Sequence, residues 1–524
     1  MLTFIPSWRI PSYEGLSNDD LINQIRAYQE SGKAYQVIIR DYIPSLRYFL
    51  HRYDLLESQY HSVFDALQES HEFEQRRVSV EELFSEKVSF HYTPFCMLVR
   101  EGGVEVGRIN FGEGSHIQEV QYFQEQQLVR IDTYDDRGFV SRRQVFENGE
   151  AGSSFYLDIK GTWIFEERLD GSCHVNPKNS KLLQKSLYPN IDALELECVS
   201  HFLRKGEAGP LLVAADMATL VWVEHSSWKS WVTLSLFKER YPYSKENLEK
   251  LSVLSEQIRG FVVDEEVALQ QLASVVSQTA SLHLLSPYDT RFSLSKSQEY
   301  AKEVLYIDVR KTSLNKTKLM IETLIAYCER CFISGHRVLQ LVFRVNDYRH
   351  QVSIEKQIED TLEAHYGPFL EELSFFNKMK ESGGNALESV LGEGLSEEAK
   401  WLEAFQEDLE VGVISHDDDF FKWLDISRMI IDLGSQPDLF TQIAGLSAGI
   451  PQLNSVSRLY MEHMKNGWLV NSQEELLEAL RYYLDSLNTW QAARVFSVQE
   501  IKRHSGIELQ RKLSKIVGDD TGGR

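Results

Sequence analysis

Met429-Ile-Ile-Asp-Leu-Gly434 is followed by Ser435-Gln-Pro-Asp-Leu-Phe440 and then by Thr441-Gln-Ile-Ala-Gly-Leu-Ser-Ala-Gly-Ile-Pro451. The first stretch has the apolar run of a buried strand, and the Pro and Asp of the second stretch are residues that begin helices. Small residues on one face of the following helix let it lie close to a sheet. This order predicts a strand, loop and helix whose N-terminal amides face the crevice where an anion binds.

The same alternation recurs away from this stretch. Val304–Val309, Leu2–Ile5 and Leu211–Ala214 are further buried runs, separated by amphipathic segments, and this pattern predicts parallel sheets. Between residues 96 and 175 the pattern differs, because turn signals such as Glu147-Asn-Gly149 recur about every 8–12 residues. That block predicts an antiparallel meander.

We therefore predict an α/β protein with two Rossmann-type domains that face a cleft, and with an antiparallel β-rich insertion in the first domain. The split N-terminal domain is expected to comprise residues 1–95 and 186–290, around an insertion at 96–185. The C-terminal domain is expected at 291–517. The polar, Gly-rich residues 518–524 are expected to form a flexible tail.

Composition limits the class of protein. Of the 524 residues, 43% are hydrophobic and 25% are charged, a balance that excludes disorder of the whole chain. At roughly 150 residues per domain, the length suggests three to four folding units. The formal net charge is −23. A surface this acidic repels phosphate backbones, so nucleic acid is not an expected partner.

The cysteines and apolar runs bear on the compartment. Five cysteines are too few for a disulfide framework and favour a reducing environment. Cys328 and Cys331 have the spacing of half a zinc site, but no second pair accompanies them, so we expect buried thiols and no metal. The N-terminus has no basic leader, and no apolar run approaches the roughly 18 residues of a membrane-spanning helix. We therefore expect a cytoplasmic protein.

Residues 429–451 resemble the donor-binding segment of retaining GT-B glycosyltransferases. In that family a Glu, seven residues and a second Glu come before Ala-Ala-Gly-Val-Pro, and the two carboxylates hold hydroxyl groups of the nucleotide-sugar. Alignment on Ala448-Gly449-Ile450-Pro451 places Gln436 and Ala444 at the two acidic positions. The resemblance thus implies a GT-B-like scaffold without its charge-assisted donor contacts, with no catalytic residue and no cofactor.

The same resemblance supplies candidate site residues in the second domain. The family uses an Arg and a Lys after the first strand of this domain to neutralise the donor diphosphate. Arg310 and Lys316 follow Val304–Val309 at a looser spacing, and a basic loop without a role is the alternative. Asp438 is two positions out of register, and we interpret it as a helix-starting residue rather than a displaced catalytic acid. Gln442 completes the candidate sugar-binding set here.

Three more candidates belong to the N-terminal domain. Trp8 and Arg9 come just after the first strand, at the expected edge of the cleft, where they can contact a sugar or a partner protein. His225 follows the apolar run Leu220–Val223, which we interpret as a strand. A capping or packing role is the alternative to ligand contact at His225.

Further sequences narrow the resemblance: Phe4-Ile-Pro-Ser-Trp8, Asp136–Arg142, Gly467–Val470 and Ala479–Asp485. With them, essentially the whole chain resembles the family of the first accessory Sec system protein. This implies a non-catalytic component that helps to deliver a glycosylated serine-rich repeat adhesin to its translocase and binds the passenger's glycans. The implied partners are the second and third accessory Sec system proteins, the accessory Sec motor ATPase and the adhesin. The implied location is cytoplasmic, or peripheral at the membrane through the translocase.

An active glycosyltransferase, or an accessory subunit of one, that acts on the same adhesin is the alternative hypothesis. Gln436 and Ala444 at the acidic positions favour the non-catalytic hypothesis. Turnover of a nucleotide-sugar that depends on Arg310 would favour the alternative.

Overall fold

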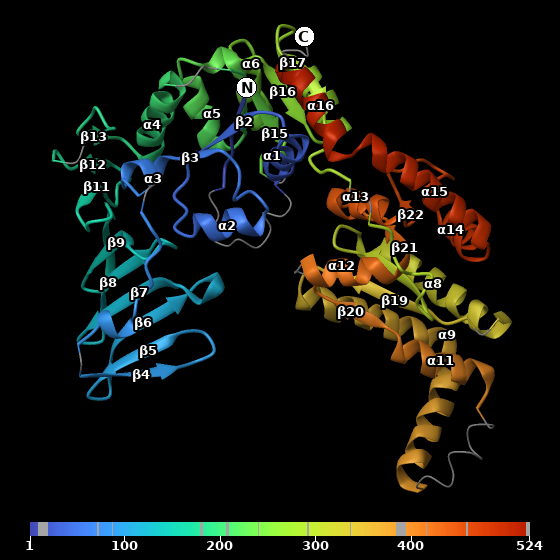
Figure 1. Cartoon of the computed structure of the whole chain (residues 1–524). Helices are drawn as coiled ribbons and strands as arrows, with labels where there is room; N and C mark the ends of the chain where they lie inside the picture. Colours follow the sequence, from blue (N-terminus) through green and yellow to red (C-terminus); the bar gives the residue numbers. More distant parts are fainter. Residues whose placement is uncertain are drawn as a thin grey trace. The chain divides into compact units, whose positions relative to one another are not determined.

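The computed structural model divides by its contacts into two compact units, Met1–Pro287 with Gly506–Arg524, and Tyr288–Ser505. Each unit holds a parallel sheet between helices, and the first unit also carries a long antiparallel sheet, so the predicted α/β class is confirmed (Figure 1). The structure describes residues 1–8, 19–70, 73–85, 87–178, 182–205, 209–238, 240–290, 293–335, 337–383, 395–414, 417–456 and 459–519.

The parallel sheet of the first unit has the order β17-β16-β15-β14-β1-β2-β3. Its strands are β1 (Leu2–Ile5), β2 (Tyr35–Ile39), β3 (Tyr60–Ser62), β14 (Leu211–Ala214), β15 (Val232–Leu236), β16 (Gly260–Val263) and β17 (Ser281–Leu284). Because β1 lies between β2 and β14, the direction of winding reverses there, and the crevice of a doubly wound sheet opens beside such a switch point. Successive residues of β1 enter cores on opposite faces: Leu2 and Phe4 on one, Ile5 on the other.

Helices cover both faces of this sheet. They are α1 (Asp20–Ser31), α2 (Leu46–Arg52), α3 (Val63–Leu67), α4 (Ile191–Lys205), α5 (Met217–Glu224), α6 (Lys245–Ser255), α7 (Glu266–Ala273) and α16 (Gly506–Val517). Side-chain caps fix several of their starts, since Asp19 accepts from the amides of Leu21 and Ile22 at the head of α1. Short 3₁₀ turns occupy Val80–Glu82, Glu113–Ser115 and Lys229–Trp231.

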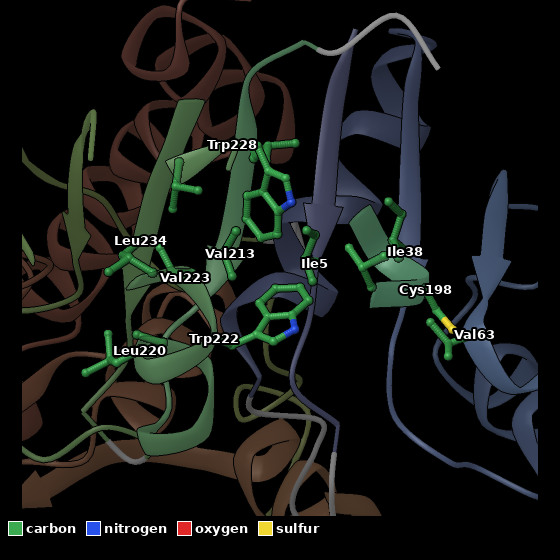
Figure 2. Packing of buried hydrophobic residues seen from close by; sticks show 14 of the residues in the cluster. Ile5, Ile38, Val63, Cys198, Val213, Leu220, Trp222, Val223, Trp228 and Leu234 are labelled. Carbon is green, nitrogen blue, oxygen red and sulfur yellow. The ribbon is translucent and has the colours of Figure 1, made fainter. Parts of the chain in front are cut away.

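Residues 220–223 form part of helix α5, so their interpretation as a strand was wrong. Asp216 starts the helix by accepting a hydrogen bond from the amide of Thr219. Figure 2 shows Leu220 and Val223 in the core beneath this helix, with Trp222 beside Trp228, whose ring centroid is 5.0 Å away. A run of four apolar residues does not distinguish a buried strand from a buried helical turn. Here the cap at Asp216 favours the helix.

The ten-stranded antiparallel sheet confirms the predicted meander. Its strands follow one another in sequence order: β4 (Val88–Tyr92), β5 (Met97–Glu101), β6 (Val104–Phe111), β7 (Ile117–Gln124), β8 (Gln127–Tyr134), β9 (Val140–Glu147), β10 (Glu150–Leu157), β11 (Trp163–Glu167), β12 (Cys173–Val175) and β13 (Leu187–Tyr188). The turn between β9 and β10 places Asn148 and Gly149 at φ 52° and 80°, the left-handed conformation that such two-residue hairpin turns require.

Ion pairs fasten the β-rich insertion to the first parallel sheet. Arg47 of α2 pairs with Asp135 and Asp136, which lie between β8 and β9, at 2.8 and 2.7 Å. Arg137 reaches back to Asp65 of α3 at 2.7 Å. The two guanidinium groups therefore bind carboxylates of helix α3 and of the loop between β8 and β9. The first residues of the family-like sequence Asp136–Arg142 thus have a structural role.

The second unit repeats the same winding. Its sheet has the order β20-β19-β18-β21-β22-β23, with strands β18 (Glu303–Asp308), β19 (Leu339–Arg344), β20 (Glu410–Gly412), β21 (Ser427–Asp432), β22 (Gln452–Asn454) and β23 (Gly467–Leu469). Its helices are α8 (Leu314–Gly335), α9 (Tyr348–Gly383), α11 (Glu397–Glu407), α12 (Asp417–Ile426), α13 (Leu439–Ala448), α14 (Gln473–Leu484) and α15 (Leu487–Arg503). None of the described helices has both the length and the apolar character that crossing a bilayer requires.

The chain ends in the unit where it began. Helix α16 packs on α1, and Tyr28 and Ser514 share a hydrogen bond of 2.7 Å. The terminal amine of Met1 pairs with Asp519 at 3.1 Å. The sequence pattern alone had grouped residues 506–517 with the second domain, whereas their contacts belong to the first unit. Residues 520–524 of the expected tail lie outside the described residues.

Arg137→Ala tests whether this network holds the insertion in place. The change leaves Asp65 and Asp135 half-paired in a largely buried site, a situation that typically costs about 3 kcal/mol of unfolding free energy. Urea unfolding of the full chain measures the loss. Arg108→Ala removes an exposed pair with Glu105 and should cost less than about 1 kcal/mol. Equal losses would show that the network contributes no more than a surface pair.

Candidate functional site

The switch point of the second unit gathers charged side chains at the carboxyl ends of its strands. Asp308 is the last residue of β18 and Asp432 the last of β21. These strands are parallel neighbours in which Ile307 lies opposite Ile431, so the two carboxylates occupy adjacent positions at one edge. Ligands of doubly wound sheets bind beside this edge.

Arg310 is held by carboxylates of its own unit. Its Nε lies 3.0 Å from Oδ1 of Asp308 and its Nη2 lies 2.6 Å from Oδ2, a two-pronged pair. Nη2 also lies 3.3 Å from Asp438. Burial alone would lower the pKa of Arg310, but Asp308 and Asp438 raise it above its ordinary value. The guanidinium therefore stays charged, and that charge is compensated inside the unit.

Asp438 begins helix α13, as the sequence predicted. It accepts hydrogen bonds from the amide of Thr441 at 3.1 Å and from the Thr441 hydroxyl at 2.7 Å. Burial favours the neutral acid, but Arg310 and Thr441 hold the pKa of Asp438 below its ordinary value. The side chain is thus an ionised helix cap and the partner of Arg310.

Asp432 organises the loop that precedes α13. Its two oxygens accept from the amides of Gly434 and Asp438 at 3.0 and 2.8 Å. Burial, reinforced by the negative charge of Asp308, raises the pKa of Asp432 to about 7. This carboxyl therefore changes protonation near neutral pH.

The remaining candidates of this unit differ in exposure. Lys316, in the first turn of α8, is half-buried; burial lowers its pKa, against the attraction of Asp432. Gln442 is 1% exposed, and neither atom of its side-chain amide has a hydrogen-bond partner among the described residues. Gln436 is exposed, and Ala444 is buried among apolar side chains. The structure thus brings Arg310 and Asp438 into contact, with Lys316 close to Asp432, and buries Gln442 beneath them on α13.

Small residues bring α13 close to the sheet. A Cβ added at Gly445 would lie 2.5 Å from Cδ1 of Ile430, nearer than such atoms approach. Gly449 ends the helix at φ 69°, where its amide donates to the carbonyls of Gly445 and Leu446. The backbone therefore requires glycine at both positions.

Trp8 serves as a structural residue at the matching edge of the first unit. Its side chain is 2% exposed and lies 4.8 Å from the ring of Phe49, and its amide donates to Asp41 at 2.7 Å. Buried in this way, the indole offers no face on which a sugar could stack. Arg9 lies outside the described residues.

The same edge carries a buried charge network that the sequence analysis missed. Arg40, which follows β2, is fully buried and contacts Asp216 at 2.8 Å and Glu195 at 3.7 Å. Arg240 pairs with Asp19 and Asp20 at 2.9 and 2.7 Å. Both of these guanidinium groups therefore face carboxylates from neighbouring elements.

His225 lies away from this edge. It follows the last residue of α5, a helix that starts beside the carboxyl end of β14 and therefore runs toward the opposite edge. Its Nδ1 lies 2.8 Å from the carbonyl oxygen of Val221. The position supports a capping role at the end of the helix.

Asp308 and Asp432 were absent from the candidate set, although a signal for them was present. Each is an acidic residue at the end of a buried apolar run, Val304-Leu-Tyr-Ile-Asp308 and Met429-Ile-Ile-Asp432. Such residues reach the crevice of a parallel sheet. Asp308 lies two residues from its partner Arg310, whereas its position beside Asp432 depends on strand neighbours far apart in the sequence.

Each of the two units has a parallel sheet wound in the same order, with charged groups at its switch point. This arrangement places the chain in the GT-B fold class. The fold matches that of the pneumococcal O-GlcNAc transferase GtfA, solved with UDP and GlcNAc, at a TM-score of 0.64 over 99% of both chains, with 12% identity. At that identity the likeness concerns the fold alone.

The chain belongs to the family of accessory Sec system protein 1, whose profile matches residues 4–519. A relative with that description from Streptococcus gordonii is 30% identical over 98% of both chains. The structure of accessory secretory proteins 1, 2 and 3 from Streptococcus pneumoniae contains a chain that matches at a TM-score of 0.76, 26% identity and 99% coverage of both. The Glycosylation Associate Protein (Gap123) complex of Streptococcus agalactiae matches at 0.75 and 27%, over 98% of this chain and 100% of that one.

Asp432→Asn should flatten the pH dependence of stability. When an acid has a higher pKa in the folded chain than in the unfolded chain, its ionisation destabilises the folded chain. For Asp432 this destabilisation is absent below the unfolded pKa near 3.8 and complete above the folded pKa of about 7. The unfolding free energy of the variant relative to the unmodified chain should therefore rise between about pH 4 and pH 8, by more than about 1 kcal/mol.

Urea titrations at each pH measure this difference. Asp308, Asp438, Arg310 and Lys316 surround the carboxyl and remain in both proteins, so their own effects largely cancel. Asp360→Asn, at an exposed carboxylate of the same unit, is the matched control. A difference that stays constant with pH would contradict a raised pKa at Asp432.

Proposed function

We propose that this chain is a non-catalytic component of the accessory Sec export system. In this role it helps to deliver a glycosylated serine-rich repeat adhesin to a dedicated translocase, together with the accessory Sec motor ATPase. Membership of the family supports the assignment to this export system. The arrangement around Arg310 supports the absence of transfer chemistry.

The internal pairing of Arg310 is the observation that carries the proposal. A nucleotide-sugar diphosphate needs cations and backbone amides at the switch point. Here the guanidinium is engaged by Asp308 and Asp438, so a diphosphate would have to displace charge-assisted bonds that already exist.

The two acidic positions of the donor segment support the same conclusion. Gln436 is exposed and Ala444 is packed in the core, so neither supplies a carboxylate for the ribose or sugar hydroxyls. Asp438 is already a helix cap and the partner of Arg310. A retained fold without these groups suits a protein that holds other molecules rather than one that transfers sugar.

Assembly with the second and third accessory Sec proteins follows from the relatives. The pneumococcal structure contains accessory secretory proteins 1, 2 and 3, and the chain that matches does so over 99% of its length. We extend that assembly to this chain, and we assign to it recognition of N-acetylglucosamine on the passenger. Binding a sugar requires hydrogen bonds and stacking but no leaving group chemistry.

Donor binding tests the loss of transfer chemistry. Full-length protein should show no calorimetric signal with UDP-N-acetylglucosamine at about 1 mM and no release of UDP. Asp308→Asn with Asp438→Asn removes two negative charges and releases Arg310, while Asn still caps α13. This double variant should bind UDP at least about tenfold more tightly than the unmodified chain.

The matched control is Asp360→Asn with Glu403→Gln, an equal change of charge elsewhere in the unit. If both double variants gained the same affinity for UDP, the gain would come from the change in net charge alone. Turnover by the unmodified chain that disappears in Arg310→Ala would overturn the proposal in favour of an active glycosyltransferase.

Recovery of partners tests the assembly. The tagged chain, isolated from its native cell, should bring down the second and third accessory Sec proteins with the motor ATPase. The purified complex should then bind glycosylated passenger at least about tenfold more tightly than unmodified passenger. Recovery of a sugar transferase alone would favour the accessory-subunit alternative, and equal binding of the two passengers would refute glycan recognition.

A further inference from the structure

Helix α9 bends sharply in its middle. Tyr366 departs from helical geometry at φ −127° and ψ 15°, and Pro368 lies inside the helix. Proline lacks an amide hydrogen and its ring clashes with the carbonyl one turn earlier, which explains the bend. In Figure 1 the part of α9 beyond the bend leaves the body of its unit.

The bend is held by side chains of neighbouring helices. The hydroxyl of Tyr366 donates to Glu329 of α8 at 2.6 Å, and its ring lies 4.9 Å from the buried ring of Trp401 on α11. Beyond the bend, Glu372 accepts from the amide and hydroxyl of Ser396, the cap of α11. The bent shape is therefore fixed before any partner arrives, which lowers the entropy cost of binding.

A groove of about 570 Å³ follows one face of α9 through this bend. Its lining residues recur at helical spacing from Glu359 to Lys378, a distance of about 28 Å along a helix. Leu362 and Leu370 provide an apolar floor, and Phe375 is 67% exposed at its side. The apolar residues among them run from Leu362 to Phe375, about 20 Å along a helix, and match one face of a helix of about four turns.

The charge around the groove indicates which kind of helix fits it. Residues 355–410 contain fifteen acidic and four basic side chains, so this short segment carries almost half of the chain's net charge of −23. Glu359, Glu363 and Glu371 lie along the groove itself, against one basic side chain, Lys378, at its end. Such a surface attracts cationic segments and repels nucleic acid, anionic lipid and a second copy of the same face.

We propose that the α9 groove binds a basic amphipathic helix of a partner protein. The apolar face of that helix covers Leu362 and Leu370 and packs against Phe375. Its Lys and Arg side chains lie opposite the three glutamates. The attraction between these opposite charges raises the rate of association and fixes the orientation of the bound helix.

Peptide binding to the full chain tests this assignment. The probe is a labelled 20-residue (~five-turn) helical peptide with Leu on one face and Lys and Arg on the other, and its scrambled sequence is the reference. The ordered peptide should bind at least about tenfold more tightly than the scrambled one. Glu359→Lys, Glu363→Lys and Glu371→Lys together, and separately Phe375→Ser, should each remove at least about tenfold of that affinity.

The matched control reverses three exposed carboxylates outside the groove, in Asp360→Lys, Glu249→Lys and Glu57→Lys. Circular dichroism confirms that every variant keeps its helices. Equal binding of ordered and scrambled peptides, or an equal loss in the control variant, would reduce the interaction to net charge and overturn the proposal. Self-association of the chain that Phe375→Ser abolishes would overturn it as well, because the groove would then hold a second copy.

Discussion

A guanidinium removed from water must meet carboxylates, and this constraint governs both switch points of the molecule. At the first, buried Arg40 lies among Asp41, Glu195 and Asp216. At the second, Arg310 lies between Asp308 and Asp438. These positions are where a doubly wound sheet ordinarily offers its positive charge to a ligand. Carboxylates of the same unit neutralise each of these two cations. The ion pairs therefore hold the loops at the two sheet edges together.

The carboxylates of the second switch point also position helix α13. Asp432 binds the loop before α13, Asp438 starts that helix, and Gly445 lets it lie against Ile430. Each group supports the next, so the strand, loop and helix form a rigid corner. A scaffold of this kind can lose a ligand and keep its shape, since its stability comes from contacts among its own residues.

Local patterns in the sequence were sufficient for much of this architecture. Buried runs such as Val304–Val309 and the turn signal at Asn148-Gly149 marked the parallel and antiparallel sheets, and Asp438 was interpreted as a helix start. The run Leu220–Val223 was misassigned because four apolar residues fit either element and Asp216 decides between them. The contact of Arg310 with Asp438 was not predicted, since it depends on the order of strands far apart in the sequence.

The return of α16 to the first unit has a consequence for synthesis of the chain. Leu509, Leu513 and Val517 belong to the same core as Leu2 and Phe4, residues made more than 500 positions earlier. On the ribosome that core stays open while the entire second unit emerges and folds. The domain translated first is thus completed last, and a truncated product would expose an apolar face that quality-control factors recognise.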